Sequence, residues 1–175
     1  SYFRNFSAPI KWETDTTFEE KLLILEFEND YFTIYDTIKG IYKKIICERI
    51  YEEPDINIEN KLISTLRSII RNNKSINLSL LSEILSIPTF SEIESEINKI
   101  DPLKIYNTID ELNYLFGTTL KEELLNKLKE IEKNITEIWP EGKDERKLIE
   151  TIWRLLLHSK DEGIKSKIIS YVDSN

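Results

Sequence analysis

Two residue types that often do chemistry occur once each in this chain of 175 residues, as His158 and Cys47. A zinc site of the His-Glu-x-x-His type needs two histidines, so a single histidine excludes it. No carboxylate lies three or four residues before His158 to complete a ligand pair on a helix. We therefore expect the imidazole to contact backbone carbonyls near the end of a helix.

Cys47 stands in the run Ile45-Ile46-Cys47, inside a stripe of apolar residues at helical spacing. A thiol buried there behaves as a small apolar side chain, without the lowered pKa of a nucleophile. The chain has no Gly-x-Ser-x-Gly motif, no glycine-rich phosphate loop and no dinucleotide-binding fingerprint. On these grounds the sequence predicts no catalytic, no cofactor-binding and no metal-binding residue.

Carboxylate pairs are the remaining candidates for acid–base chemistry. They are Glu19-Glu20, Glu52-Glu53, Glu122-Glu123, and Glu92 with Glu96. Adjacent residues point to different sides of a helix, whereas a pair four residues apart shares one face. The chain has 32 acidic residues, so solvent-exposed faces are their expected role. A small enzyme built on carboxylates would need convergent acids with raised pKa values in a polar cleft.

Charge and hydropathy argue against two classes of partner, nucleic acids and membranes. The net charge of −8 and a pI near 4.9 argue against nucleic acid, which requires a basic surface. The longest apolar runs, such as Leu22–Leu25, are far shorter than the roughly 20 residues that span a bilayer. The chain opens without a basic leader and apolar stretch, and its lone cysteine fits a reducing compartment. We expect a cytoplasmic protein that binds neither nucleic acid nor membrane.

Helical spacing of apolar residues runs through almost everything after residue 16, which predicts an all-α domain of seven to nine helices over residues 17–175. The first expected helix begins after one of three capping candidates, Asp15, Thr16 and Thr17. The others begin at Tyr31, at Ile58, at Leu78, after Thr89, at Leu103, at Asp144 and at Asp161. The segment from Leu103 to about Ile138 is long, and Gly117 either divides it into two helices or only bends it. Short connections favour antiparallel neighbours, stacked as a curved layer or closed into a bundle.

Residues 1–16 have a different character. They contain Ala8-Pro9-Ile10 and the aromatic residues Tyr2, Phe3, Phe6 and Trp12, without helical spacing. Proline favours an extended backbone in the residue before it, so we expect an extended strap. The strap either packs over the first helices or forms a seam to a neighbouring domain, and in the second case its aromatic side chains would form an exposed apolar patch.

Two stretches carry a resemblance to a known family. Ser1–Ile10 resembles the segment that joins two domains in the bacterial-type aminopeptidase N family of zinc-dependent aminopeptidases. Ile87–Ile93, followed by Ile100–Leu103, is similar to the Leu-Pro-Ser … Glu … Asp-Pro pattern of that family's C-terminal helical domain. The resemblance implies that residues 1–16 are an interdomain strap. It also implies that residues 17–175 are the first part of an α-superhelix built from antiparallel helical hairpins.

The resemblance further implies a parent enzyme that holds zinc and removes N-terminal amino acids from peptides. Its catalytic and β-rich domains would be the partners of this segment, which would cover the peptide chamber. The family's His-Glu-x-x-His and Gly-x-Met-Glu-Asn motifs cannot be present in a chain with one histidine and no methionine. The expected role is therefore non-catalytic, and the alternative is a free-standing helical adaptor that binds a peptide or a protein.

Overall fold

The computed structural model describes residues 16–72, 77–97, 101–134 and 142–173. Within these ranges the chain forms nine α-helices and no β-strand, which confirms the predicted all-α class. The helices are α1 (Phe18–Phe27), α2 (Tyr31–Tyr51), α3 (Ile56–Arg71), α4 (Leu78–Leu85), α5 (Phe90–Glu94), α6 (Pro102–Thr119), α7 (Lys121–Asn134), α8 (Lys143–His158) and α9 (Glu162–Asp173). Residues 1–15 lie outside the described ranges, so the strap and its aromatic patch stay predictions.

Several of the helices start where a side chain binds the free N–H groups of the first turn, whereas α8 starts after Gly142 without such a side chain. The Thr17 hydroxyl accepts from the Glu20 N–H at 3.2 Å, and the Glu20 carboxylate accepts from the Thr17 N–H at 2.7 Å. Asp101 accepts from the Leu103 N–H at 3.0 Å, with Pro102 in the first helical position. Both starts were predicted, because each depends on a local sequence pattern.

The long segment after residue 102 is two helices, and they meet at Leu120. Its N–H donates to the carbonyl of Phe116 at 2.9 Å, and α7 begins at the next residue. The Leu120 side chain is fully buried in the core. Gly117 itself lies within α6, so the helix ends beyond the glycine that the sequence singles out.

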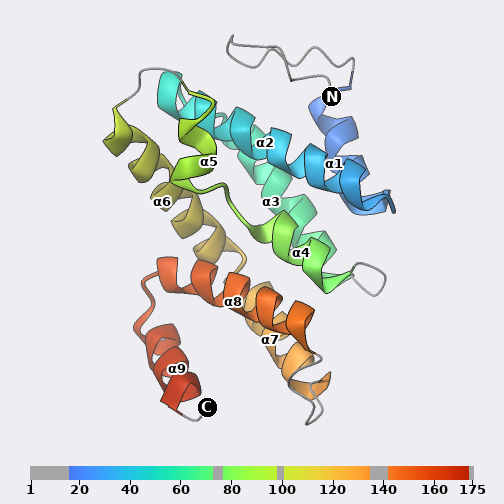
Figure 1. The fold of residues 1–175 in the computed structure, drawn as a ribbon, viewed down its shortest axis with the longest axis vertical. Helices are drawn as coiled ribbons and strands as arrows, with labels where there is room; N and C mark the ends of the chain where they lie inside the picture. Colours follow the sequence, from blue (N-terminus) through green and yellow to red (C-terminus); the bar gives the residue numbers. More distant parts are fainter. Residues whose placement is uncertain (1–15, 73–76, 98–100, 135–141, 174–175) are drawn as a thin grey trace.

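Two helices, α2 and α8, each pack against several others. α2 packs against α1, α4 and α6, whereas α8 packs against α4, α6, α7 and α9. Figure 1 shows α1 and α9 at opposite ends of the long axis, with α4 and α6 between the layers of α2 and α8. One apolar core runs from Leu22 of α1 to Ile164 of α9. This stack of helices agrees with the predicted α-superhelix. None of the helices in the described ranges has the length and apolar character needed to cross a membrane.

Candidate functional site

His158 ends α8 and contacts a backbone carbonyl, as predicted. Its Nδ1 lies 2.7 Å from the carbonyl oxygen of Arg154, one turn earlier in the same helix. Its Nε2 lies 3.9 Å from Oδ1 of Asp110 on α6. The imidazole therefore closes the end of α8 and faces α6.

Cys47 is half-buried in the C-terminal part of α2. Burial raises the pKa of its thiol, and the neighbouring carboxylate of Glu96 raises it further. Both effects oppose formation of the thiolate, which is the nucleophilic form. The charged groups that act on this thiol are Glu96, Lys43 and Glu48. His158 contacts Arg154 and Asp110 instead.

The carboxylate pairs separate into individual structural contacts. Glu123 is buried whereas Glu122 is exposed, so the two carboxylates of this adjacent pair have different environments, although both line one open hollow. Glu92 accepts from the Thr89 N–H at 2.8 Å, while Glu96 forms an ion pair with Lys43 of α2. Over the described ranges, no group of three or more histidine, cysteine, aspartate or glutamate side chains is arranged to hold a metal ion.

Among the described residues, three carboxyl groups have pKa values shifted downward. A hydrogen bond from Lys61 lowers the pKa of Glu19, and hydrogen bonds from Thr33 lower that of Asp30. The contact with Lys121 lowers the pKa of Asp161. A general acid at neutral pH needs a raised pKa, so these three groups are poorly suited to that role.

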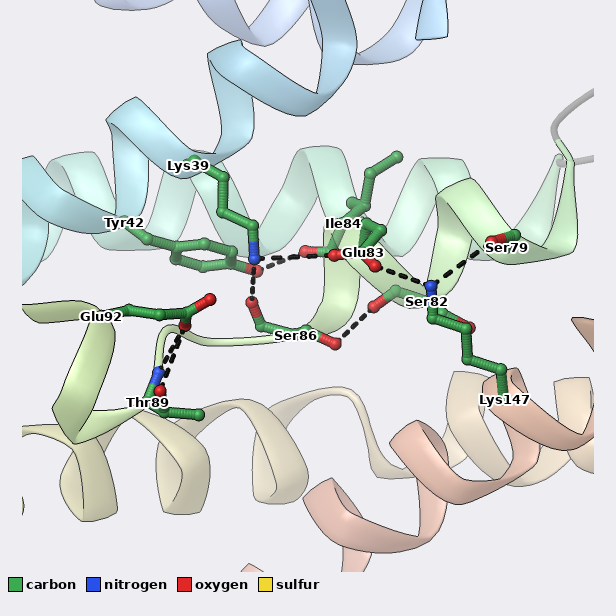
Figure 2. A network of polar contacts seen from close by, with 10 residues as sticks. All are labelled: Lys39, Tyr42, Ser79, Ser82, Glu83, Ile84, Ser86, Thr89, Glu92 and Lys147. Carbon is green, nitrogen blue, oxygen red and sulfur yellow. Dashed lines mark hydrogen bonds and ion pairs between the residues drawn. The ribbon is translucent and has the colours of Figure 1, made fainter. Parts of the chain in front are cut away.

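A polar network joins α2, α4 and α8 (Figure 2). Glu83 of α4 accepts from Lys147 of α8 at 2.6 Å and lies 3.7 Å from the Lys39 ammonium of α2. The Lys147 ammonium also donates to the Ser79 hydroxyl at 3.4 Å. The hydrogen bond with Glu83 is the main cause of the raised pKa of Lys147. One carboxylate thus links two cations from two helices, which fixes α4 between them.

The same network covers the C-terminal end of α4. The buried hydroxyl of Tyr42 donates to the carbonyl of Ile84 at 2.5 Å, and Lys39 donates to the carbonyl of Ser86 at 3.5 Å (Figure 2). The last carbonyls of a helix have no partner within it, so side chains from α2 supply the missing donors. Complete burial raises the pKa of Tyr42, which keeps the phenol protonated as a donor. The network holds helices together and exposes no convergent pair of acids.

A second polar cluster surrounds an open hollow of about 620 Å³ where α3 meets the α6–α7 junction. The buried Glu123 carboxylate accepts through Oε1 from Arg67 Nε at 2.9 Å and from Arg71 Nη2 at 2.7 Å. Thr118 and Lys121 also line this hollow. Sequence reasoning missed the cluster, although two arginines four residues apart share one face of a helix. Their partner lies far along the chain, and only the packing of α3 against α7 reveals it.

Comparison with known proteins places the chain in a family. The model of the family described as "Domain of unknown function (DUF3458_C) ARM repeats" matches residues 18–174. Aminopeptidase N of Escherichia coli (strain K12) is 24% identical over 123 residues, which cover 69% of this chain and 14% of that protein. The chain thus corresponds to about a seventh of that relative's length.

The fold is also found in a solved structure. The crystal structure of Legionella pneumophila aminopeptidase A in complex with aspartic acid superposes with a TM-score of 0.72 at 20% sequence identity. The match covers 94% of this chain and 20% of that one. The sequence resemblance to the aminopeptidase N family is thereby confirmed. The chain belongs to the DUF3458_C family of ARM-repeat domains, which forms the helical C-terminal domain in the aminopeptidase N family.

Proposed function

We propose that this chain is a non-catalytic part of a zinc metallo-aminopeptidase that packs on the peptidase domain and encloses the peptide chamber. The observation that carries this proposal is the family match over residues 18–174. The parent enzyme, a cytoplasmic hydrolase, would hold the zinc in its catalytic domain and remove N-terminal amino acids from peptides. The chain's own contribution would be steric, since a wall limits which substrates reach the metal.

The packing of the helices supports a wall that keeps its shape. The core is continuous along the stack, and close-packed protein interiors are stiff. Ion pairs and hydrogen bonds between helices add fixed points, such as Glu83 between Lys39 and Lys147. A rigid wall can admit a short peptide and exclude a folded protein without any chemistry of its own.

One face of α6 supports packing against a neighbouring domain. Leu103, Tyr106 and Tyr114 are 62%, 52% and 48% exposed, respectively. At 100° per residue these three positions fall on one side of the helix. The ring of Tyr106 stacks on Phe90 of α5, with centroids 4.3 Å apart. The exposed Asn107 and Asp110 lie on the same side, so the face is mixed, apolar and polar. We infer that this face contacts the catalytic or the β-rich domain of the parent.

The proposal is tested in the aminopeptidase that carries this segment, with and without the segment. With the wall in place, short peptides should be cleaved and a folded protein with a free N-terminus should be cleaved much more slowly. Without it, that discrimination should fall, and the isolated chain should co-elute with the remaining domains when added back. Unchanged discrimination and no co-elution would overturn the proposal. Binding of peptides by the isolated chain alone would instead favour the free-standing adaptor.

A further inference from the structure

The turn between α1 and α2 exposes large apolar side chains from both helices. Phe27, the last residue of α1, is 70% exposed, and Phe32, in the first turn of α2, is 74% exposed. Leu23 is 53% exposed and lies four residues before Phe27, so these two side chains share a face of α1. Phe27 and Phe32 are five residues apart, which keeps their α-carbons within about 18 Å of each other. A segment of six or more extended residues can therefore cover both rings. We call Leu23, Phe27, Phe32 and the turn between the helices the α1–α2 corner.

The α1–α2 corner is acidic. Residues 22–38 contain no lysine or arginine, and their acids are Glu26, Glu28, Asp30 and Asp36. The last three of these are exposed. Phe32 and Asp36 are four residues apart, so the ring and the carboxylate share one face of α2. Hydrogen bonds from Thr33 lower the pKa of Asp30, which keeps its carboxylate ionised at neutral pH. The exposed rings are thus surrounded by negative charge.

The cations of the network beside α2 do not neutralise this charge. Lys39 and Lys147 share the carboxylate of Glu83 (Figure 2). When these two cations are included, the carboxylates still outnumber them by four to two, as Glu28, Asp30, Asp36 and Glu83.

The cations of α1 and α3 act elsewhere. Arg67 and Arg71 of α3, which packs against α1, bind Glu123 of α7. Lys21 of α1 lies close enough to Lys44 for that charge to lower its pKa, and Lys44 is more than three turns beyond the start of α2. Within the part of the chain that the structure describes, the corner therefore keeps an excess of negative charge.

The same helix already holds a cation against an aromatic ring. The Lys39 ammonium lies 5.5 Å from the centroid of the Tyr35 ring and 3.7 Å from a Glu83 carboxylate oxygen. The Tyr31 ring stacks on Tyr35 with centroids 6.4 Å apart, and the Phe32 ring meets Tyr31 edge to face at 5.7 Å. A row of rings thus leads from the bound lysine to the exposed phenylalanine. A ring beside a carboxylate attracts a cation, and Phe32 with the aspartate one turn later presents that pair of groups to solvent.

We propose that the α1–α2 corner binds a basic segment of a partner polypeptide, with an arginine stacked on the Phe32 ring and paired with Asp36. Arginine is suited to both contacts, because its planar guanidinium stacks on aromatic rings and binds both oxygens of a carboxylate. Apolar side chains of the same segment would contact Phe27 and Leu23. Charge argues against other occupants, since a second copy of this chain would bring like charges together, and nucleic acids and anionic membranes would be repelled.

This inference goes beyond the proposed function and does not depend on it, because it concerns the isolated chain and a basic peptide. The test is fluorescence anisotropy with the full 175-residue chain and the peptide Ala-Arg-Leu-Ala-Arg-Leu-Ala-amide, labelled with an uncharged dye. A peptide with lysine in place of arginine should bind about threefold more weakly, because lysine stacks less well on a ring. A peptide with glutamine in place of arginine should bind at least about tenfold more weakly, and added salt should weaken binding of the arginine peptide.

Matched variants locate the site. Phe32→Ala and Asp36→Asn should each weaken binding of the arginine peptide by about threefold or more. Tyr51→Ala removes an exposed ring at the other end of α2, and Asp173→Asn removes an exposed carboxylate at the end of α9, so both should bind as the wild type does. Circular dichroism of each variant shows that the helices remain folded.

Three results would overturn the proposal. Unchanged binding by Phe32→Ala and Asp36→Asn, or no binding by the wild type, would overturn the site. Equal binding of the arginine and glutamine peptides would overturn the basic character of the partner. A dimer of the chain in sedimentation that Phe32→Ala converts to a monomer would replace the partner with a second copy.

Discussion

The α-carbon of Gly117 in α6 lies directly against the backbone carbonyl of Leu155 in α8. A Cβ atom added at Gly117 would lie 2.0 Å from the Leu155 carbonyl oxygen and 2.9 Å from its carbon. Both atoms are backbone, so they cannot move aside as the end of a side chain can. Glycine lowers helix stability by about 1 kcal/mol relative to alanine, and here it allows two helices to meet.

Replacing Gly117 by alanine should therefore destabilise the domain. The methyl group would push α6 and α8 apart, and overpacking of this kind costs about 3 kcal/mol. Urea denaturation followed by circular dichroism measures the change in the free energy of unfolding. Gly163→Ala is the matched control, because a Cβ at that position would meet only a side-chain atom, Asp161 Oδ1, at 3.1 Å. The control should be no less stable than the wild type, because alanine favours the helix by up to about 1 kcal/mol over glycine. A Gly117→Ala protein as stable as the wild type would show the helix contact to be unimportant.

Gly117 also shows which features of the fold cannot be predicted from the sequence. The starts of α1, α4, α6 and α9 follow from capping residues within a few positions of each helix, so the sequence contains them. Gly117 is conspicuous in sequence because it lowers helix propensity, which suggests a break in the helix. Position 117 requires glycine because the backbone of Leu155, far along the chain, leaves no room for a Cβ atom. No pattern in the residues around Gly117 predicts its contact with Leu155. The helix does not break at the glycine but ends at Thr119.

Tyr42 should contribute to stability through its hydroxyl group. Tyr42→Phe would leave the Ile84 carbonyl without the donor that lies 2.5 Å away in a fully buried position. Loss of a buried partner costs about 1–2 kcal/mol, which chemical denaturation can measure. Tyr35→Phe removes the same group from a half-buried position on the same helix, so a much smaller loss is expected. Equal losses from the two variants would contradict the cap assigned to Tyr42.

The two glutamates bound to Arg49 should differ strongly in their effects. The Glu59 side chain is 5% exposed and the Glu111 side chain is 62% exposed. Glu59→Gln would leave a buried guanidinium without its main counter-charge, at a cost of about 3 kcal/mol. Glu111→Gln removes a solvent-screened contact and should cost less than about 1 kcal/mol. Thermal unfolding of both variants in one buffer compares their losses of stability. A larger loss for Glu111→Gln than for Glu59→Gln would refute the prediction.

Lys21 should make stability depend on pH in the alkaline range. Burial, with a smaller contribution from Lys44, lowers its pKa from 10.5 to about 8. Below pH 8 the ammonium is charged in both the folded and the unfolded state, so the folded state carries the full burial penalty. Between pH 8 and 10.5 the unfolded state binds more protons, so stability rises with pH.

The Lys21→Met variant isolates this effect. The free energy of unfolding of the wild type, minus that of the variant, should increase as the pH rises from 8 to 10.5. Denaturant titrations at several pH values measure that difference. A constant difference across this range would show that the pKa of Lys21 is the same in the folded and unfolded states.

The candidate site residues, like the helices, include some that the sequence could predict and others that it could not. His158 could be assigned to the end of a helix because its contact lies one turn away in the same helix. The buried position of Glu123 could not be assigned, because its two arginines lie on α3 and become neighbours only when α3 and α7 pack together. Family membership could be recognised without any knowledge of the fold, because two short stretches, Ser1–Ile10 and Ile87–Leu103, resemble the aminopeptidase N family.

The central claim is that this chain is catalytically inert and that the parent's zinc lies elsewhere. The most direct measurement incubates the purified chain with zinc, then measures its metal content and its hydrolysis of an alanyl arylamide. The account predicts no turnover above buffer and no stoichiometric zinc after dialysis. Turnover that a chelator abolishes and that added zinc restores would contradict it.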